Sequence, residues 1–266
     1  MEFTLANVVR GAVWLQTSMD NDTRGTARDP RFAALRHDDW TCQGCGCRSS
    51  PCDEDLWAGL EVHHKDDNPD NQTLANLATL CPLCHGLMHC DLMLEQGLLP
   101  GRFLWSERIP QRFLTLYVHV RAVVDVRCAR LAEQGIVHAK EARSTEEERM
   151  LRIRDRCEEV DRALARCTLA GVTLTLRGRR YDLADMLDGR EAALGLVLGR
   201  LVRTGSREER ARAAARLRPL RWLCDWRRHP KARVYAQSEV WGSASEWAGQ
   251  WFAETRRLLG RAGLSR

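Results

Sequence analysis

The sequence contains few lysines and no long hydrophobic run. Only three of its 41 basic residues are lysine, so arginine supplies nearly all of the positive charge. Uncharged stretches in the carboxyl-terminal half are short, such as residues 192–199, whereas a membrane-spanning helix needs about 20 mostly apolar residues. We therefore expect no membrane span. Among the 266 residues 44% are hydrophobic and 29% are charged, which excludes wholesale disorder and a small disulfide-stapled scaffold.

The amino terminus also lacks the features of a secretory signal. Glu2 stands where such a signal carries positive charge, and Asn7 and Arg10 interrupt any apolar segment. We therefore expect a cytoplasmic protein. A reducing compartment disfavours disulfides, so cysteines that cluster are expected to bind a metal. Seven of the 11 cysteines lie between residues 42 and 90, and the other four are expected to pack as small apolar side chains.

Charge is divided unevenly along the chain. Residues 1–140 hold 14 basic and 18 acidic residues, a net charge of −4, and residues 141–266 hold 27 and 18, a net charge of +9. The basic half is suited to a polyanion such as DNA. The alternative is that the arginine content partly reflects coding bias.

Two cysteine pairs form the strongest motif. Cys42 and Cys45 are separated by two residues, and Cys81 and Cys84 repeat this spacing. A turn between two such thiols directs both sulfurs at one ion, and two pairs complete the tetrahedral thiolate site that zinc prefers. The spacing leaves alternatives open, because one thiol of this set could be replaced by Cys47, Cys52, Cys90 or His89.

Four histidines lie between or beside these cysteines. Residues 60–65 alternate as a strand does, so His63 and His64 are expected on opposite sides of it. Pro82 suits the first turn of a helix. On that helix His85 and His89 are four residues apart, share a face and can bind one ion.

Taken together, these motifs resemble the HNH nuclease family and its ββα-metal fold over about residues 31–92. The resemblance rests on Arg36-x-Asp38-Asp39-Trp40-Thr41-Cys42-Gln43-Gly44-Cys45-Gly46, His63-His64, Asn76-Leu77 and Cys81-x2-Cys84-His85-x3-His89. It implies a DNA endonuclease in which His64 is the general base that activates water and Asn76 orients His64. His63, His85 and His89 would hold a divalent cation such as Mg²⁺. The separate structural zinc would be bound by Cys42, Cys45, Cys81 and Cys84.

A second resemblance favours a different function. Over about residues 1–126, including residues 101–111, the chain is similar to the DotN/IcmJ family of coupling-complex subunits in type IVB secretion and related conjugation systems. This family implies a non-catalytic adaptor that works with a coupling ATPase. Three acidic residues after His64 also oppose DNA binding, namely Asp66, Asp67 and Asp70. This chain nevertheless keeps the four histidines that the adaptor family is expected to have lost.

The remaining sequence predicts helices and a basic surface. Capping boxes at Ser144/Glu147 and Ser206/Glu209 each open a helix, residues 112–126 have helical spacing, and residues 171–181 suit a hairpin. Residues 200–233 are predicted to form a basic helical region, in which arginines on shared helical faces suit phosphate. Trp222 and Trp226 could stack on bases, although a solvated helix face with these tryptophans in the core is the alternative. The arginines are Arg203, Arg207, Arg210, Arg212 and Arg216.

The expected architecture is α+β, with two parts. Residues 1–130 would form an HNH-like zinc-binding domain, and residues 131–266 a mainly α-helical, arginine-rich domain. The first hypothesis is a metal-dependent DNA endonuclease. The alternatives are the coupling-complex adaptor and a non-catalytic, zinc-dependent nucleic-acid-binding protein.

Overall fold

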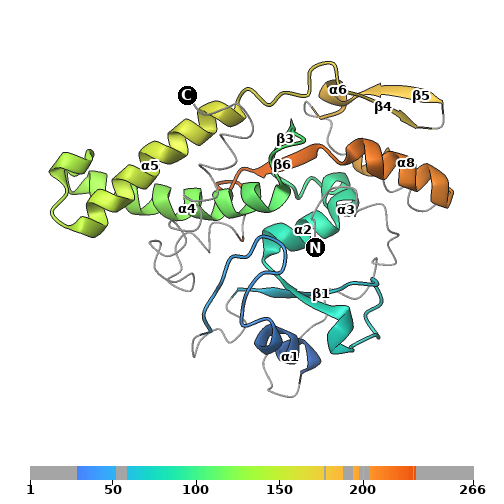
Figure 1. The fold of residues 1–266 in the computed structure, drawn as a ribbon, viewed down its shortest axis with the longest axis horizontal. Helices are drawn as coiled ribbons and strands as arrows, with labels where there is room; N and C mark the ends of the chain where they lie inside the picture. Colours follow the sequence, from blue (N-terminus) through green and yellow to red (C-terminus); the bar gives the residue numbers. More distant parts are fainter. Residues whose placement is uncertain are drawn as a thin grey trace.

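The computed structural model describes residues 29–51, 59–176, 178–187, 194–197, 200, 204–229 and 231 (Figure 1). Within these ranges helices are mixed with short antiparallel strands, as the α+β prediction requires. None of the helices in the described part of the chain is long and apolar enough to cross a bilayer.

A small amino-terminal unit contains a two-stranded hairpin followed by helices (Figure 1). Strand β1 (Glu61–His64) pairs antiparallel with β2 (Leu77–Leu80), and the short 3-10 helix η2 (Leu74–Asn76) precedes β2. Helix α1 (Pro30–His37), capped by Asp29, precedes the hairpin, and α2 (Pro82–Met88) and α3 (Cys90–Glu95) follow it. The strand predicted at residues 60–65 and the helix predicted to open at Pro82 are both confirmed.

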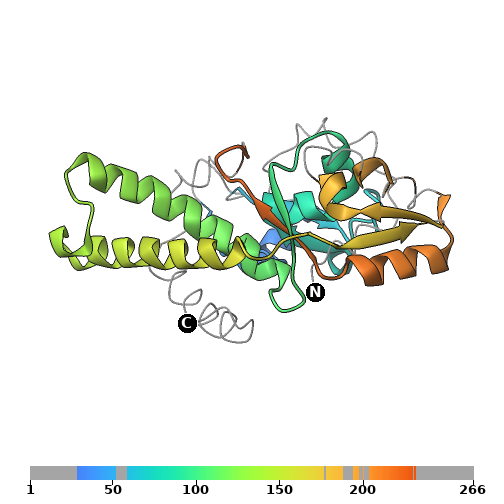
Figure 2. The same ribbon diagram turned by 90° about the horizontal axis from the view of Figure 1, so that it is seen from above.

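Two long helices pack side by side as an antiparallel pair (Figure 2). Helix α4 (Gln111–Glu133) is joined through the 3-10 helix η3 (Ala139–Glu141) to α5 (Thr145–Leu164). The predicted capping box of Ser144 and Glu147 opens α5. Across the pair, the Tyr117 hydroxyl donates to the Cys157 carbonyl at 3.2 Å and to the Asp161 carboxylate. The apolar side of α5, which includes Met150, Ile153 and Val160, is buried within the fold.

A second sheet joins distant parts of the chain. Strand β3 (Gly101–Trp105) pairs antiparallel with β6 (Leu220–Cys224), so that Gly101 lies opposite Cys224. The Gln111 side chain fixes α4 to this sheet, because it donates to the Trp222 carbonyl and accepts from the Trp222 amide, each at 2.8 Å. Strand β6 was not predicted, because this stretch was interpreted as part of a basic helical region. Trp222 is 2% exposed, so it belongs to the core and cannot stack on a base.

The remaining elements lie to one side of the β3–β6 pair in both views (Figures 1 and 2). Strands β4 (Thr173–Leu176) and β5 (Arg179–Asp182) form the predicted hairpin, which is followed by α6 (Leu183–Leu187). Helix α8 (Arg207–Leu217) starts at the predicted capping box of Ser206 and Glu209. The predicted domain boundary at residues 130 and 131 falls inside α4, and β3 and β6 come from opposite sides of it, so the packing does not divide the chain there.

The β3–β6 pairing depends on a glycine without a side chain. Gly101 has φ +149°, and a Cβ there would lie 2.3 Å from the Leu223 carbonyl oxygen. Replacing Gly101 with alanine is therefore expected to lower the free energy of unfolding by roughly 3 kcal/mol, measured by chemical denaturation. Gly135→Ala is the control, since its φ is +78° but a Cβ meets no atom within 4 Å, and it should cost about 1 kcal/mol. Equal losses in the two variants would contradict this account of the sheet.

Candidate metal centre

Four thiols gather at the base of the amino-terminal unit. Cys42 and Cys45 lie on a turn, closed by hydrogen bonds from the Cys42 amide to the Cys47 carbonyl and from the Gly46 amide to the Cys42 carbonyl, each 2.8 Å. Cys81 caps α2, and its sulfur accepts from the Cys84 amide at 3.4 Å. The four buried sulfurs lie within 4.8 Å of one another.

These distances fit a tetrahedral thiolate site. The sulfurs of Cys45 and Cys81 are 3.8 Å apart. Zinc–sulfur bonds of about 2.3 Å place sulfurs about 3.8 Å apart along a tetrahedral edge. The set of Cys42, Cys45, Cys81 and Cys84 could therefore bind a metal ion such as zinc.

The four residues that the sequence left open as alternative zinc ligands are placed differently relative to the four-thiol set. The Cys47 thiol belongs to an overlapping group of possible ligands that also contains His119 of α4. Cys90 is buried but is in none of the groups of possible metal ligands found among the described residues, and Cys52 lies outside the described residues. His89 belongs to a separate group of three histidines. Sequence reasoning missed His119, because no local motif connects residue 119 with the cysteine pairs.

Three imidazoles form a second cluster. His63 comes from β1 and His85 from α2, and His89 lies just beyond the end of α2, where α3 begins. Their ring centroids are 5.0–5.5 Å apart, and one nitrogen of each ring lies within 4.8 Å of the others. The Nε2 atoms of His85 and His89 are 3.3 Å apart. The predicted pair thus meets although His89 is not inside α2, and the group could hold a metal ion.

A carboxylate orients one of these rings. His85 donates from Nδ1 to Oε2 of Glu61 at 2.6 Å, which leaves its Nε2 facing His89. A histidine that binds a metal through one nitrogen usually donates from the other to a carboxylate or carbonyl. Sequence reasoning missed Glu61. Residues two apart in a strand share a face, so strand alternation already places Glu61 on the same face as His63. Lys231 forms an ion pair with Glu61 and so brings a distant residue to the cluster.

The environment keeps the cluster suited to a cation. Burial raises the pKa of Glu61, but the hydrogen bond and charge of His85 and the charge of Lys231 outweigh burial and lower it to about 2. Burial, together with the charge of His85, lowers the pKa of His63 to about 4 and that of His89 to about 3. Both rings are therefore neutral near pH 7, and their lone pairs are available as ligands.

These pKa values predict how stability depends on pH. Both lie below the ordinary value of 6.5, so between about pH 6.5 and 4 the unfolded chain binds more protons than the folded protein. The contribution of the two neutral rings to the free energy of unfolding is therefore present above pH 6.5 and is lost as the pH falls toward 4. Each histidine is expected to account for a loss on the order of 2 kcal/mol between pH 7 and pH 5 without a bound cation.

Chemical denaturation measures this loss, in protein that keeps the zinc of the thiol set but whose imidazole cluster has been freed of cations with a weak chelator. The double variant His63→Gln/His89→Gln is the reference, because it retains the pH dependence of the thiol set while removing both titrating rings. The wild type should lose more stability than the double variant on going to pH 5. Identical losses would contradict the low pKa values of the two rings.

His64 follows His63 at the end of β1, and Asn76 lies just before β2 at the same end of the hairpin. His64 is 7% exposed, and its Nε2 has no hydrogen-bond partner among the described residues. The Asn76 side chain donates to the Asp66 carboxylate at 2.7 Å and to the Asn71 carbonyl at 2.9 Å, and accepts from the Asp66 amide at 3.1 Å. Its observed partners thus lie in the loop that follows His64, whereas the family resemblance implied that it orients His64.

The same hydrogen-bond network includes Asp66, one of the acidic residues in the loop that follows His64. Asp66 also accepts from the Asn71 side chain at 2.7 Å and the Asn68 amide at 3.0 Å, so its charge is used within the loop. Burial and the charges of Asp66 and Asp91 raise the pKa of Asp67 to about 6. Asp67 is still mostly ionised at pH 7 and Asp66 keeps its charge, so the loop retains the negative charge that its sequence suggests.

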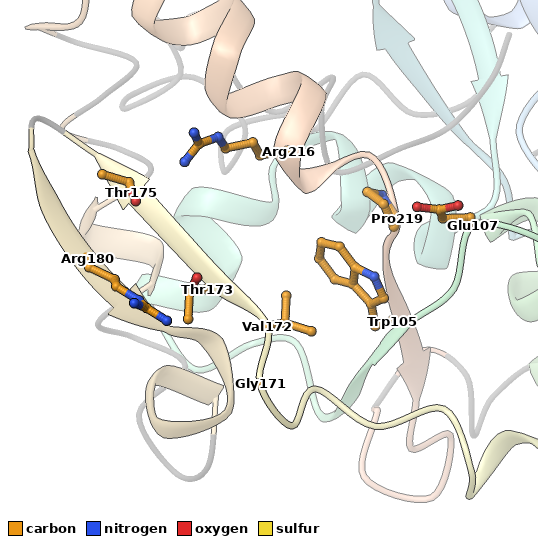
Figure 3. A pocket seen from close by; sticks show the side chains of 9 residues that line it. All are labelled: Trp105, Glu107, Gly171, Val172, Thr173, Thr175, Arg180, Arg216 and Pro219. Atoms are coloured by element: carbon orange, nitrogen blue, oxygen red, sulfur yellow. The ribbon is translucent and has the colours of Figure 1, made fainter.

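The predicted arginine surface is only partly described. Arg207, Arg210, Arg212 and Arg216 lie on α8, and Arg203 lies outside the described residues. Arg212 pairs with Glu208 at 2.5 Å. Arg216 lines a hollow of about 810 Å³ with Arg180 of β5 and Trp105 of β3 (Figure 3). This hollow combines two guanidinium groups and an indole with the carboxylate of Glu107.

The amino-terminal unit thus contains two clusters with different donor atoms. The sulfur set suits a structural ion, since all four thiols are buried. The imidazole set contains the partly exposed His85, and its His63 is followed on β1 by His64, whose Nε2 has no hydrogen-bond partner among the described residues. No protein-family model matches this chain, and no curated protein matches it.

Proposed function

We propose that this protein is a metal-dependent DNA endonuclease of the HNH type. The observation that carries the proposal is the convergence of His63, His85 and His89, whose ring nitrogens lie within 4.8 Å of one another. Three imidazoles with converging ring nitrogens favour a divalent cation and leave positions around it open to substrate. The carboxylate of Glu61 behind His85 completes a pattern typical of metal ligands.

The order of the elements supports this assignment. Two antiparallel strands, β1 and β2, are followed by α2, and each histidine of the cluster comes from this unit or its end. The thiol cluster lies at the start of α2, where a zinc ion would hold the helix against the preceding turn. This arrangement supports the ββα-metal fold that the sequence resemblance implies.

The proposed reaction assigns a task to each side chain. A divalent cation, when bound, would stabilise the charge that develops on the phosphate and the leaving oxygen. His64 accepts the proton of the attacking water at Nε2, the atom without a partner among the described residues. Glu61 fixes the tautomer of His85 by accepting from its Nδ1. Asn76 holds the loop that follows His64.

The substrate would be bound by the basic part of the chain. Cations that meet phosphates supply most of the affinity for DNA. Arg180 and Arg216 line the hollow beside Trp105, so one surface offers two guanidinium groups for phosphates and an aromatic ring for a base (Figure 3). Lys231 places a further positive charge next to the imidazole cluster.

Plasmid nicking tests the proposal. The purified chain, with zinc in the thiol cluster but not at the imidazoles, should nick supercoiled DNA when Mg²⁺ or Mn²⁺ is added and should lose this activity with a chelator that leaves the thiol-bound zinc in place. His89→Gln should lower the rate at least roughly 100-fold, because it removes a ligand but retains a polar side chain. Absence of nicking by the zinc-loaded wild type with either cation would contradict the proposal. Stable co-purification with a coupling ATPase, without cleavage, would instead favour the adaptor function.

A further inference from the structure

Cys47 and His119 are two buried residues of ligand type that the four-thiol set does not use. Cys47 is 2% exposed and follows Cys45 by two residues. His119 is 3% exposed, lies on α4, and places its Nε2 3.3 Å from the Cys81 sulfur. The two residues therefore approach the same cluster, one from the turn after the first cysteine pair and one from a helix outside the amino-terminal unit.

The geometry defines a second set of four ligands. The sulfurs of Cys45, Cys47 and Cys81 and a ring nitrogen of His119 all lie within 4.8 Å of one another. This set has three thiols and one imidazole, a donor combination that zinc binds in structural sites. It shares Cys45 and Cys81 with the first set, and these two sulfurs are 3.8 Å apart, the length of one tetrahedral edge.

We propose that the cluster binds two zinc ions bridged by the thiolates of Cys45 and Cys81. One ion would be completed by Cys42 and Cys84, and the other by Cys47 and His119. Two tetrahedra that share an edge need six ligands, and the cluster supplies six, five sulfurs and one nitrogen. This inference does not depend on the proposed nuclease activity, because it concerns only the sulfur cluster.

Charge balance favours two ions over one. Zinc is bound by thiolates, so five buried thiolates around a single dication would leave three uncompensated negative charges. A second dication reduces the excess to one. Uncompensated charge is costly in a buried site. The arrangement that competes with this proposal is one zinc, a protonated Cys47, and a His119 ring that donates to the Cys81 sulfur.

The second ion would also connect two parts of the fold. Cys45, Cys47 and Cys81 belong to the amino-terminal unit, whereas His119 belongs to α4, which packs on α5 and β6. Binding of one ion by all four would fix the unit that contains the imidazole cluster to the α4–α5 pair.

Counting zinc tests the proposal. The full chain with His63→Gln, His85→Gln and His89→Gln serves as the background, because zinc at the imidazoles can no longer contribute. Native mass spectrometry and elemental analysis of this background should give two zinc ions per chain. Adding Cys47→Ala or His119→Ala should reduce the number to one, and adding Cys90→Ala should leave two. One zinc in the background, or two after removal of Cys47, would overturn the proposal.

Cadmium NMR gives a test that needs no substitution. Wild-type protein loaded with ¹¹³Cd should show two thiolate-type resonances of equal intensity, one from the four-sulfur set and a more shielded one from the three-sulfur, one-nitrogen set. Cadmium at the imidazole cluster would resonate well apart, since it has no sulfur ligand. A single thiolate-type resonance in fully loaded protein would overturn the proposal even if the variants fail to fold.

Discussion

Replacing His64 with alanine is expected to lower plasmid nicking by about 10²–10⁴-fold, the range that a positioned general base contributes. The side chain is 7% exposed, and its Nε2 has no hydrogen-bond partner among the described residues. A buried polar atom without a partner is uncommon in folded proteins and suggests that a substrate or water meets it during function. The rate is measured with Mg²⁺ and with Mn²⁺ on the same preparation.

Two controls separate loss of the base from loss of the fold. Zinc content should be unchanged in His64→Ala, because His64 belongs to none of the ligand groups formed by the described residues. His37→Ala is the matched variant, since His37 is an exposed histidine at the end of α1, and it should cleave at the wild-type rate. Unchanged cleavage by His64→Ala would exclude His64 as the base.

Replacing Cys84 with alanine is expected to unfold the amino-terminal unit. Cys84 belongs only to the four-thiol set and lies in the first turn of α2. Structural zinc sites in small units contribute about 10–16 kcal/mol at pH 7, as much as the whole net stability of many domains. Loss of one thiolate should therefore release zinc and remove hydrogen-exchange protection from β1, β2 and α2.

Cys90→Ala is the control for this effect. Cys90 is as deeply buried as Cys84, but it belongs to neither sulfur set. Its replacement should keep the zinc and cost about 1 kcal/mol, the transfer free energy of a small apolar group. Equal loss of protection in the two variants would mean that burial, and not metal binding, holds the unit together.

The sequence predicted those parts of the fold and the site that depend on interactions between residues close together in the chain. The spacing of Cys42 and Cys45 fixes a turn that directs both thiols one way, and Pro82 starts the helix on which His85 lies. The capping boxes of Ser144 and Ser206 each open a helix where they were predicted to do so, because a side chain and a backbone amide three residues apart satisfy each other locally.

The parts that were missed depend on contacts between distant residues. Gly101 pairs with Cys224 across more than a hundred residues, and β6 looks like basic helix when its partner strand is unknown. His119 reaches Cys81 only because α4 packs on the amino-terminal unit. The ion pair of Lys231 with Glu61 likewise has no local signal. Strand alternation could have identified Glu61, because it is the first residue of β1 and shares a face with His63.

Anomalous diffraction from crystals soaked in Mn²⁺ tests the central claim most directly, since it locates the cation without relying on activity. The account predicts a manganese peak within coordination distance of a ring nitrogen of His63, His85 and His89, with the hydrogen bond from His85 to Glu61 intact. Rings turned apart, with no manganese between them in fully soaked crystals, would contradict it.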